Sequence, residues 1–328
     1  MSVDLFLKLF TLFVVGGIGY GAARAGLTGG AAGLRTLSNI GFMVFLPGLL
    51  FRTTATVNLA ALPWRLVAAF FGPLLLWALG VWAWQRWHRV PGTDDPAAPA
   101  IRAVTLSFGN TVQLGLPFAA ALFGEEGLRL HVALVSLHAL LLLGPFTVLA
   151  EADRARAAAR HTGALAIGQT LLTIARQTLI HPVVLPVLLG LAWNLGGLAL
   201  PQWLDSVLQM LGQGAVPLCL VLIGVSLDQY GLGPRWSAAA GLAALKLLLL
   251  PALVATSGVL VFHLDGVALS VLVMAAALPA GSNTLLFAQR YRVLEGEASA
   301  VIVLSTAGFA LTAPLWLSAL AWWRTVGW

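Results

Sequence analysis

Charged side chains are scarce in this chain. Aspartate, glutamate, lysine and arginine make up 9% of its 328 residues, whereas 59% of the residues are hydrophobic. Soluble globular domains carry roughly 25% charged residues, so this composition cannot supply the usual water-exposed surface. Apolar runs of about 18 or more residues, long enough to cross a bilayer, recur along the chain. The composition predicts an integral membrane protein with the lipid bilayer as its main partner.

Cysteine and the motifs of common enzyme classes are also lacking. The single cysteine, Cys219, excludes a disulfide within the chain. No GK[ST] phosphate loop, HExxH, CxxC or GxSxG motif occurs, so no catalytic residue, metal site or cofactor is expected. The 18 lysine and arginine residues are scattered without a basic block, which argues against a nucleic-acid partner. Neither an enzyme nor a nucleic-acid-binding protein is predicted.

The apolar runs divide the chain into ten expected membrane spans. They cover residues 4–23, 32–51, 61–86, 100–123, 128–150, 178–197, 204–227, 236–262, 265–290 and 297–322. The widest polar interval, 151–177, is predicted to be a cytoplasmic linker between a first half at 1–150 and a second half at 178–328. The expected fold class is therefore an all-α membrane protein with five spanning helices in each half.

Short segments recur between the halves at a nearly constant offset in residue number. GYGAARAGL from Gly19 returns as GLAWNLGGL from Gly190, an offset of 171, and FLPGLLF returns as AVPLCLV at an offset of 170. Gly-Asn-Thr around Asn110 returns as Ser-Asn-Thr around Asn283, an offset of 173. Because five spans is an odd number, the second copy must enter the membrane from the opposite side. Such an inverted repeat is typical of transporters.

Positive charge is divided unevenly between the two sets of loops. Loops after odd-numbered spans carry twelve arginines, whereas the opposite face carries five lysine or arginine residues. Cytoplasmic loops are enriched in these residues, so the linker is expected inside the cell and both termini outside the cytoplasm. This topology is that of a multi-pass protein of the inner, or plasma, membrane.

Proline, glycine and small polar residues interrupt the fourth and ninth spans. Pro117 and Pro279 are expected to kink or break these helices, because proline lacks an amide donor and clashes with the preceding turn. Two breaks matched by the repeat would expose backbone groups to one shared mid-membrane cavity. Side-chain amides, hydroxyls and half-helix N-termini at this point suit a carboxylate. The predicted substrate-binding residues are Asn110, Thr111, Gln113, Pro117, Pro279, Ser282, Asn283 and Thr284. Simple bending of the helices is the alternative, and it explains one such helix better than two.

Other polar residues within or near the spans leave alternatives open. Lys246, the only cation well inside a span, either pairs with an anionic substrate or extends its stem toward an interface. His181 is interpreted as an interfacial residue, with a proton carrier as the alternative. Gln209, Gln213 and Ser226 either line a cavity or form hydrogen bonds between helices. No Asp or Glu lies in the middle of an apolar run, which argues against a cation pump.

Five segments, in order, resemble the auxin efflux carrier family: FLPGLLF, GNTVQLGLP, AVPLCLVLIGVSL, ALPAGSNTLLFAQRY and LSTAGFALTAPLWL. That family includes bacterial carriers of malonate or malate and the PIN-type auxin exporters of plants. The resemblance implies two inverted five-helix repeats, with helices four and nine broken and crossing beside the substrate. By this resemblance Asn110, Pro117, Pro279 and Asn283 take the crossover positions. The chain departs from the family at His181, where an asparagine usually precedes the proline.

The predicted function is secondary transport of a small organic anion by alternating access. By resemblance, malonate, malate or an auxin-like carboxylate is the expected substrate. A sodium-coupled symporter resembling the bile acid carriers is the alternative within transport, and a membrane-embedded sensor is the alternative of another class. Coupling to protons or sodium, the direction of flux and a homodimeric state are left open.

Overall fold

The computed structural model describes residues 3–56, 62–88, 95–162, 184–230 and 236–326. Within these ranges all regular elements are helices, including five-residue π-helical turns labelled η, which confirms the all-α expectation. The first half contains α1 (Val3–Arg24), α2 (Gly30–Ile40), η1 (Gly41–Phe45), α3 (Leu46–Thr56), α4 (Trp64–Trp87), α5 (Ala98–Ser107), η3 (Thr111–Gly115) and α6 (Leu116–Thr162). The second half contains α8 (Val184–Leu195), α9 (Gln202–Tyr230), α10 (Trp236–Ala244), η4 (Leu245–Leu249), α11 (Leu250–Thr256), η5 (Ser257–Val261), α12 (Gly266–Ala277), α13 (Asn283–Tyr291) and α14 (Glu295–Val326).

Five helical segments of the described residues are long and apolar enough to cross a membrane. They are Gly30–Thr56, Trp64–Trp87, Leu122–Ala158, Trp236–Val261 and Glu295–Trp323. The remaining helices fall in the other expected ranges, but they include the short halves of the interrupted fourth and ninth spans. A multi-pass membrane protein is therefore confirmed, while the count of ten spans stays a prediction.

The start of the expected linker is helical. α6 continues to Thr162, so the first part of the 151–177 interval extends the helix that precedes it. Within α6 the backbone kinks at Gly124, where φ is 63° and ψ is −155°. Residues 163–183, with His181 among them, lie outside the described part of the chain.

Three π-helical turns end two residues before a proline. η1 precedes Pro47, η3 precedes Pro117 and η4 precedes Pro251. A proline ring clashes with the carbonyl group of the preceding turn, and a turn that holds one extra residue relieves this clash. Pro117 was expected to kink or break the fourth span, and of these two outcomes the break does not occur at Pro117. Helical geometry runs from η3 directly into α6, and the break lies earlier, at residues 108–110.

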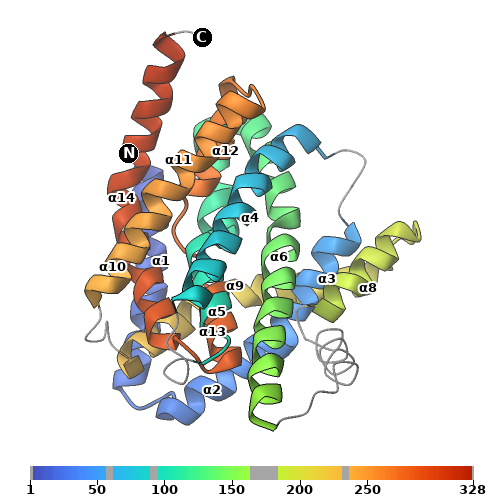
Figure 1. The fold of residues 1–328 in the computed structure, drawn as a ribbon, viewed down its shortest axis with the longest axis vertical. Coiled ribbons are helices and arrows are strands. Elements are labelled where there is room, and N and C mark those ends of the chain that lie inside the picture. Colours follow the sequence, from blue (N-terminus) through green and yellow to red (C-terminus); the bar gives the residue numbers. More distant parts are fainter. Residues whose placement is uncertain (1–2, 57–61, 89–94, 163–183, 231–235, 327–328) are drawn as a thin grey trace.

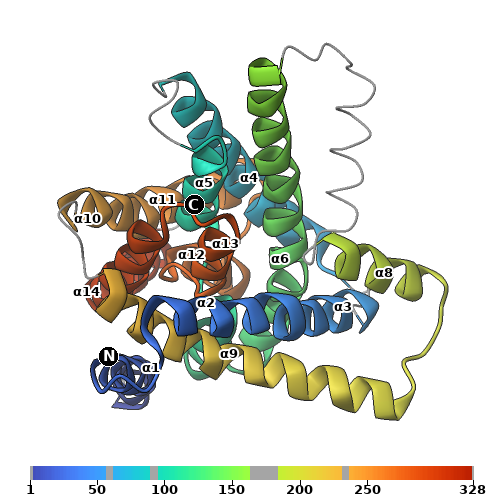
Figure 2. The ribbon, with the colours of Figure 1, turned by 90° about the horizontal axis from the view of Figure 1, so that it is seen from below.

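The helices form two bundles that lie side by side (Figures 1 and 2). In Figure 2, α2 and α3 run along α9 at the lower edge of the molecule, with α1 and α8 beside them. We call this group the peripheral bundle. The second group, which we call the crossing bundle, comprises α4, α5, α6 and α10 to α14 with the π turns between them. Packing within each bundle is more extensive than packing between the bundles.

Glycines allow close backbone contacts inside the peripheral bundle. A Cβ atom at Gly19 of α1 would lie 2.2 Å from the carbonyl oxygen of Val221 in α9. A Cβ atom at Gly190 of α8 would lie 2.5 Å from the carbonyl oxygen of Phe51 in α3. Subtracting 19 from 190 gives 171, and subtracting 51 from 221 gives 170, which are the offsets of the repeated sequence segments. The α1–α9 and α3–α8 contacts therefore use matching positions of the two halves.

Ion pairs join the helices of the crossing bundle near one end. Arg102 of α5 makes two hydrogen bonds to Glu297 of α14, at 2.7 and 3.1 Å. Asp153 of α6 is buried and accepts hydrogen bonds from Arg86 and Trp82 of α4, at 2.7 and 3.0 Å. These bonds join α5 to α14 and α4 to α6 within the crossing bundle.

Candidate functional site

The fourth and ninth spans are both interrupted where they meet. Residues 108–110 separate α5 from η3, and residues 278–282 separate α12 from α13. The two non-helical segments run antiparallel and form an isolated bridge between Gly109 and Ala280. Backbone groups released by each break therefore find partners in the other break, as the interior of a membrane requires. We call this place the crossing.

Two backbone hydrogen bonds hold the crossing, and each mirrors the other. Asn110 N donates to Pro279 O at 2.8 Å, and Gly281 N donates to Phe108 O at 2.9 Å. Subtracting 108 from 279 and 110 from 281 gives 171 in both cases. Any antiparallel bridge relates its two bonds in this way, and the value of 171 equals the offset of the segments at Gly19 and Gly190.

Side chains from the following long helices also bind the crossing. Gly109 N donates to His138 Nε2 of α6 at 3.1 Å, and Ala280 N donates to Ser305 Oγ of α14 at 3.0 Å. Both side chains are buried. Each bridge residue is therefore tied to the helix that follows it in its own half.

The helix ends that lead into the crossing are bound by a second pair of side chains, Lys246 and Trp77. Lys246 Nζ in η4 is fully buried and donates to Ala276 O and Leu278 O, both at 3.0 Å. At the end of α5, Trp77 Nε1 of α4 donates to Leu106 O at 3.3 Å. The carbonyl end of a helix carries partial negative charge, which an ammonium group stabilises. Lys246 thus binds the end of α12, and its stem does not extend toward an interface.

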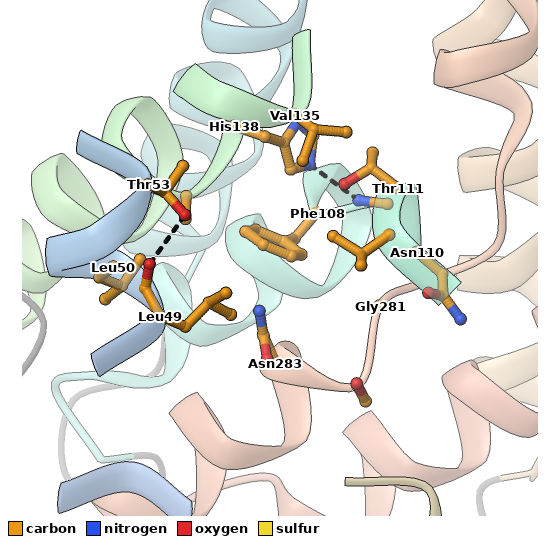
Figure 3. A pocket seen from close by; sticks show the side chains of 14 residues that line it. Leu49, Leu50, Thr53, Phe108, Asn110, Thr111, Val135, His138, Gly281 and Asn283 are labelled. Carbon is orange, nitrogen blue, oxygen red and sulfur yellow. Dashed lines mark hydrogen bonds between the residues drawn. The ribbon is translucent and has the colours of Figure 1, made fainter. Parts of the chain in front are cut away.

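A cavity of about 80 Å³ lies beside the crossing (Figure 3). This volume has room for several waters or one small molecule, since a single water needs about 10–15 Å³ by the same measure. α3 lines one side of the cavity, whereas the crossing and α6 line the other. The lining residues are Leu49, Leu50, Thr53, Phe108, Gly109, Asn110, Thr111, Val112, Val135, His138, Ala139, Gly281, Ser282 and Asn283. The cavity therefore lies between the peripheral and the crossing bundles.

Four of the residues predicted to bind substrate line this cavity, namely Asn110, Thr111, Ser282 and Asn283. Pro279 lies in the crossing and accepts one of its hydrogen bonds. Thr284 is fully buried, and its hydroxyl donates to Gly281 O at 2.8 Å, so it supports the turn into α13.

Gln113 lies in the η3 turn, and Pro117 lies at the start of α6, beyond the last residue of the break. The side chains of these two residues are not among those that the structure describes. Pro279 corresponds to Phe108 at the offset of 171 and to Leu106 at the offset of 173, and to Pro117 at neither. The crossing therefore contains a proline in its second segment only.

The two asparagine amides point in different directions. Figure 3 shows the Asn283 amide directed between Leu49 and Phe108, whereas the Asn110 amide is directed away from it. Asn110 Oδ1 is buried and has no hydrogen-bond partner within the described part of the chain. In this conformation the Asn283 amide therefore extends into the cavity, whereas Asn110 lines only its edge.

His138 and the α3 residues of the cavity were not predicted from the sequence. His138 is 29 positions from its hydrogen-bond partner Gly109, so no local sequence motif predicts this contact. The sequence did give one indication of His138, which is its position in the middle of an apolar span, where an ionisable residue is rare. Leu49 and Thr53 carried no comparable signal, since apolar and hydroxyl residues are ordinary in membrane helices.

The polar residues of the seventh span have separate roles. Ser226 of α9 is buried, and its Oγ accepts a hydrogen bond from Gln289 Nε2 of α13 at 3.3 Å. Gln209 and Gln213 are exposed on α9. Of the alternatives left open, hydrogen bonding between helices applies to Ser226, and this bond joins the two bundles.

Comparison with known proteins identifies the family to which the chain belongs. No curated protein matches the chain. A family profile described as membrane transport protein matches residues 4–317, a range that includes both halves, the crossing and every residue of the cavity. The resemblance noted from five sequence segments is thereby confirmed at the level of the family: the chain belongs to the membrane transport protein family of the auxin efflux carrier type.

Proposed function

We propose that this protein is a secondary transporter that carries a small carboxylate across the inner, or plasma, membrane by alternating access. The main support for this proposal is the position of the cavity between the peripheral and the crossing bundles. Its lining comes from α3 of the peripheral bundle and from the crossing and α6 of the crossing bundle. Movement of one bundle against the other would change the side from which a ligand at this boundary is reached.

An inverted five-helix repeat is part of the proposal. The glycine contacts of the peripheral bundle follow the offsets of the sequence segments to which they belong, 171 and 170. The two hydrogen bonds of the crossing are related by 171, two residues less than the offset of 173 between the Asn110 and Asn283 segments. The glycine contacts thus support a pseudo-two-fold axis between the halves. Such an axis in the membrane plane gives inward-facing and outward-facing states of similar energy. It also agrees with termini on the non-cytoplasmic side and a linker inside.

The chemistry of the cavity favours an anion. The Asn283 amide supplies donors, and the N-terminus of α13 carries partial positive charge. None of the described lining residues is acidic, so nothing in the lining repels a carboxylate. Malonate, malate and auxin-like carboxylates are the proposed substrates, because carriers that the sequence resembles act on molecules of this kind.

Transport into proteoliposomes tests the proposal. Flux of labelled malonate, malate and indole-3-acetate is measured for the wild type, Asn283→Ala, Asn110→Ala and the control Gln213→Ala. Asn283→Ala should lose most of the flux of the transported acid, and Asn110→Ala should lose part of it. Gln213→Ala should keep the flux, because Gln213 is exposed on α9. Unchanged flux in both asparagine variants would contradict the site.

The coupling ion is tested in the same vesicles. Sodium is replaced by potassium at constant pH, and a pH gradient is then imposed without sodium. A sodium-coupled symporter would stop in the first experiment, and a proton-coupled carrier would respond to the second. Binding of a carboxylate without any flux, under all of these gradients, would favour the sensor alternative.

A further inference from the structure

His138 lines the cavity and makes a hydrogen bond that fixes the position of its proton. The side chain lies on α6 and is 2% exposed. Its Nε2 accepts the hydrogen bond from Gly109 N. An imidazole nitrogen that accepts a hydrogen bond carries no proton, so the neutral ring must carry its proton on Nδ1. The crossing therefore selects one tautomer of His138.

The Nδ1 atom of His138 is buried and has no hydrogen-bond partner among the described residues. The ring is also held in its orientation, because it packs edge-on against Phe108 at 4.6 Å and against Phe70 and Phe71 at 5.9 and 6.1 Å between centroids. It cannot turn to find another acceptor without losing the bond to Gly109. A buried donor left unpaired is unfavourable, so the partner expected for Nδ1 is a water or a ligand in the adjoining cavity.

The other half of the chain shows that attachment of the crossing needs no imidazole. Ser305 Oγ accepts the bond from Ala280 N and donates to Ile302 O at 3.2 Å, so its hydroxyl is fully used. Ser305 is not among the residues that line the cavity, whereas His138 is. The side chain that attaches the crossing beside the cavity thus has one spare donor, whereas the side chain that attaches it away from the cavity has none.

We propose that His138 is a substrate-binding and specificity-determining residue, held neutral by the crossing so that its Nδ1–H donates to an anionic oxygen of the substrate. This inference rests on the proposed function of the cavity. A neutral imidazole can bind a carboxylate without adding a positive charge to a bundle that already buries Lys246. It also favours ligands that place an oxygen acceptor beside Phe108 over apolar ligands of the same size.

Two conservative variants separate the two hydrogen bonds of the ring. In His138→Gln the side-chain oxygen can take the position of Nε2 and keep the bond from Gly109, while the Nδ1 donor is lost. In His138→Asn the amide can take the position of Nδ1 and donate, but it is too short to keep the bond to Gly109. Ser305→Ala is the matched control, since it removes the corresponding bond of the crossing away from the cavity.

Affinity and thermal stability are measured on purified protein with malonate, malate and indole-3-acetate as probes. For the acid that binds the wild type, His138→Gln should raise Kd by roughly tenfold or more with little change in Tm, because a hydrogen bond to a charged group is lost. His138→Asn and Ser305→Ala should lower Tm while keeping more of the affinity. Wild-type affinity in His138→Gln would overturn the inference.

A spectroscopic signature separates a binding role from a structural one. In protein labelled with ¹⁵N-histidine, the resonances absent from His138→Gln identify His138. They should report the neutral Nδ1–H tautomer without ligand, and the Nδ1 proton should shift when the acid is added. A protonated Nε2, or no shift on binding, would contradict the assignment. If Asn283→Ala loses binding while His138→Gln keeps it, only this inference fails; if both keep it, the cavity itself is not the substrate site.

Discussion

Gly224 of α9 contacts Gly16 of α1 so closely that a Cβ atom on Gly224 would lie 1.9 Å from the Gly16 carbonyl oxygen. Together with the contact of Gly19 on Val221, this leaves α1 and α9 touching through their backbones. Small residues allow such contacts between membrane helices, where dispersion forces replace the hydrophobic effect as the source of association. The peripheral bundle therefore depends on the absence of side chains at a few positions.

Alanine at these glycines should separate the two helices. We expect Gly224→Ala and Gly19→Ala to destabilise the protein by about 1–3 kcal/mol, because the added methyl group meets backbone that cannot move aside. Thermal unfolding and size-exclusion profiles in detergent measure the effect. Gly17→Ala is the control, since nothing lies within 4 Å of a Cβ atom there. Equal stability of all three variants would show that the helices are not packed in this way.

Lys246 should stabilise the protein through the hydrogen bonds that its ammonium group donates to the end of α12, rather than through the apolar contacts of its aliphatic stem. Lys246→Gln retains a donor, whereas Lys246→Met retains only apolar contacts. We expect Lys246→Met to lower Tm more than Lys246→Gln does, because the carbonyl groups of Ala276 and Leu278 then lose their partner. The reverse order would show that burying the ammonium group outweighs the gain from these hydrogen bonds.

The size of the cavity should determine which acid is preferred. Leu49 of α3 lies opposite Phe108 and Asn283, so Leu49→Ala enlarges the space between them (Figure 3). We expect the ratio of indole-3-acetate to malonate transport to rise by roughly 5- to 150-fold, which corresponds to the ~1–3 kcal/mol that such a change in a pocket is worth. Competition assays in proteoliposomes measure the ratio. Leu76→Ala, at a residue that is 72% exposed, should leave it unchanged.

Alternating access requires that Ser226 and Gln289 separate, because their hydrogen bond joins the two bundles. In a chain whose Cys219 is replaced by serine, a short thiol cross-linker between Ser226→Cys and Gln289→Cys should stop transport, and reductive cleavage should restore it. A cross-link between Arg102→Cys and Glu297→Cys, which lies within the crossing bundle, should leave transport in place. Continued transport through the first cross-link would exclude movement between these bundles.

The all-helical, multi-pass character of the protein was predictable because a membrane leaves few choices of backbone structure. Apolar runs long enough to span it identified the positions of the helices, and the matched polar segments around Asn110 and Asn283 identified the crossing and four lining residues of its cavity. Pro279 lies where the helix was expected to break. These predictions needed only local composition and the distance between similar segments.

The rest depended on geometry that composition does not encode. Pro117 was expected to kink or break its helix, whereas the break lies at residues 108–110 and helical geometry runs from η3 into α6. Lys246 was assigned to the substrate or to an interface, whereas its ammonium group meets two carbonyls 30 and 32 positions away. His138 was not predicted because its role exists only where α6 passes the crossing.

The crossing also constrains the order in which the protein can be completed. Asn110 belongs to the fourth span and is synthesised well before Pro279, its hydrogen-bond partner in the ninth. Until that partner is inserted, the peptide groups of segment 108–110 have no backbone acceptor or donor from the ninth span, and hydrocarbon supplies none. The first half must therefore remain in the membrane without these backbone hydrogen bonds until the ninth span is inserted. A half expressed by itself should be degraded, and the two halves expressed as separate chains should rescue each other.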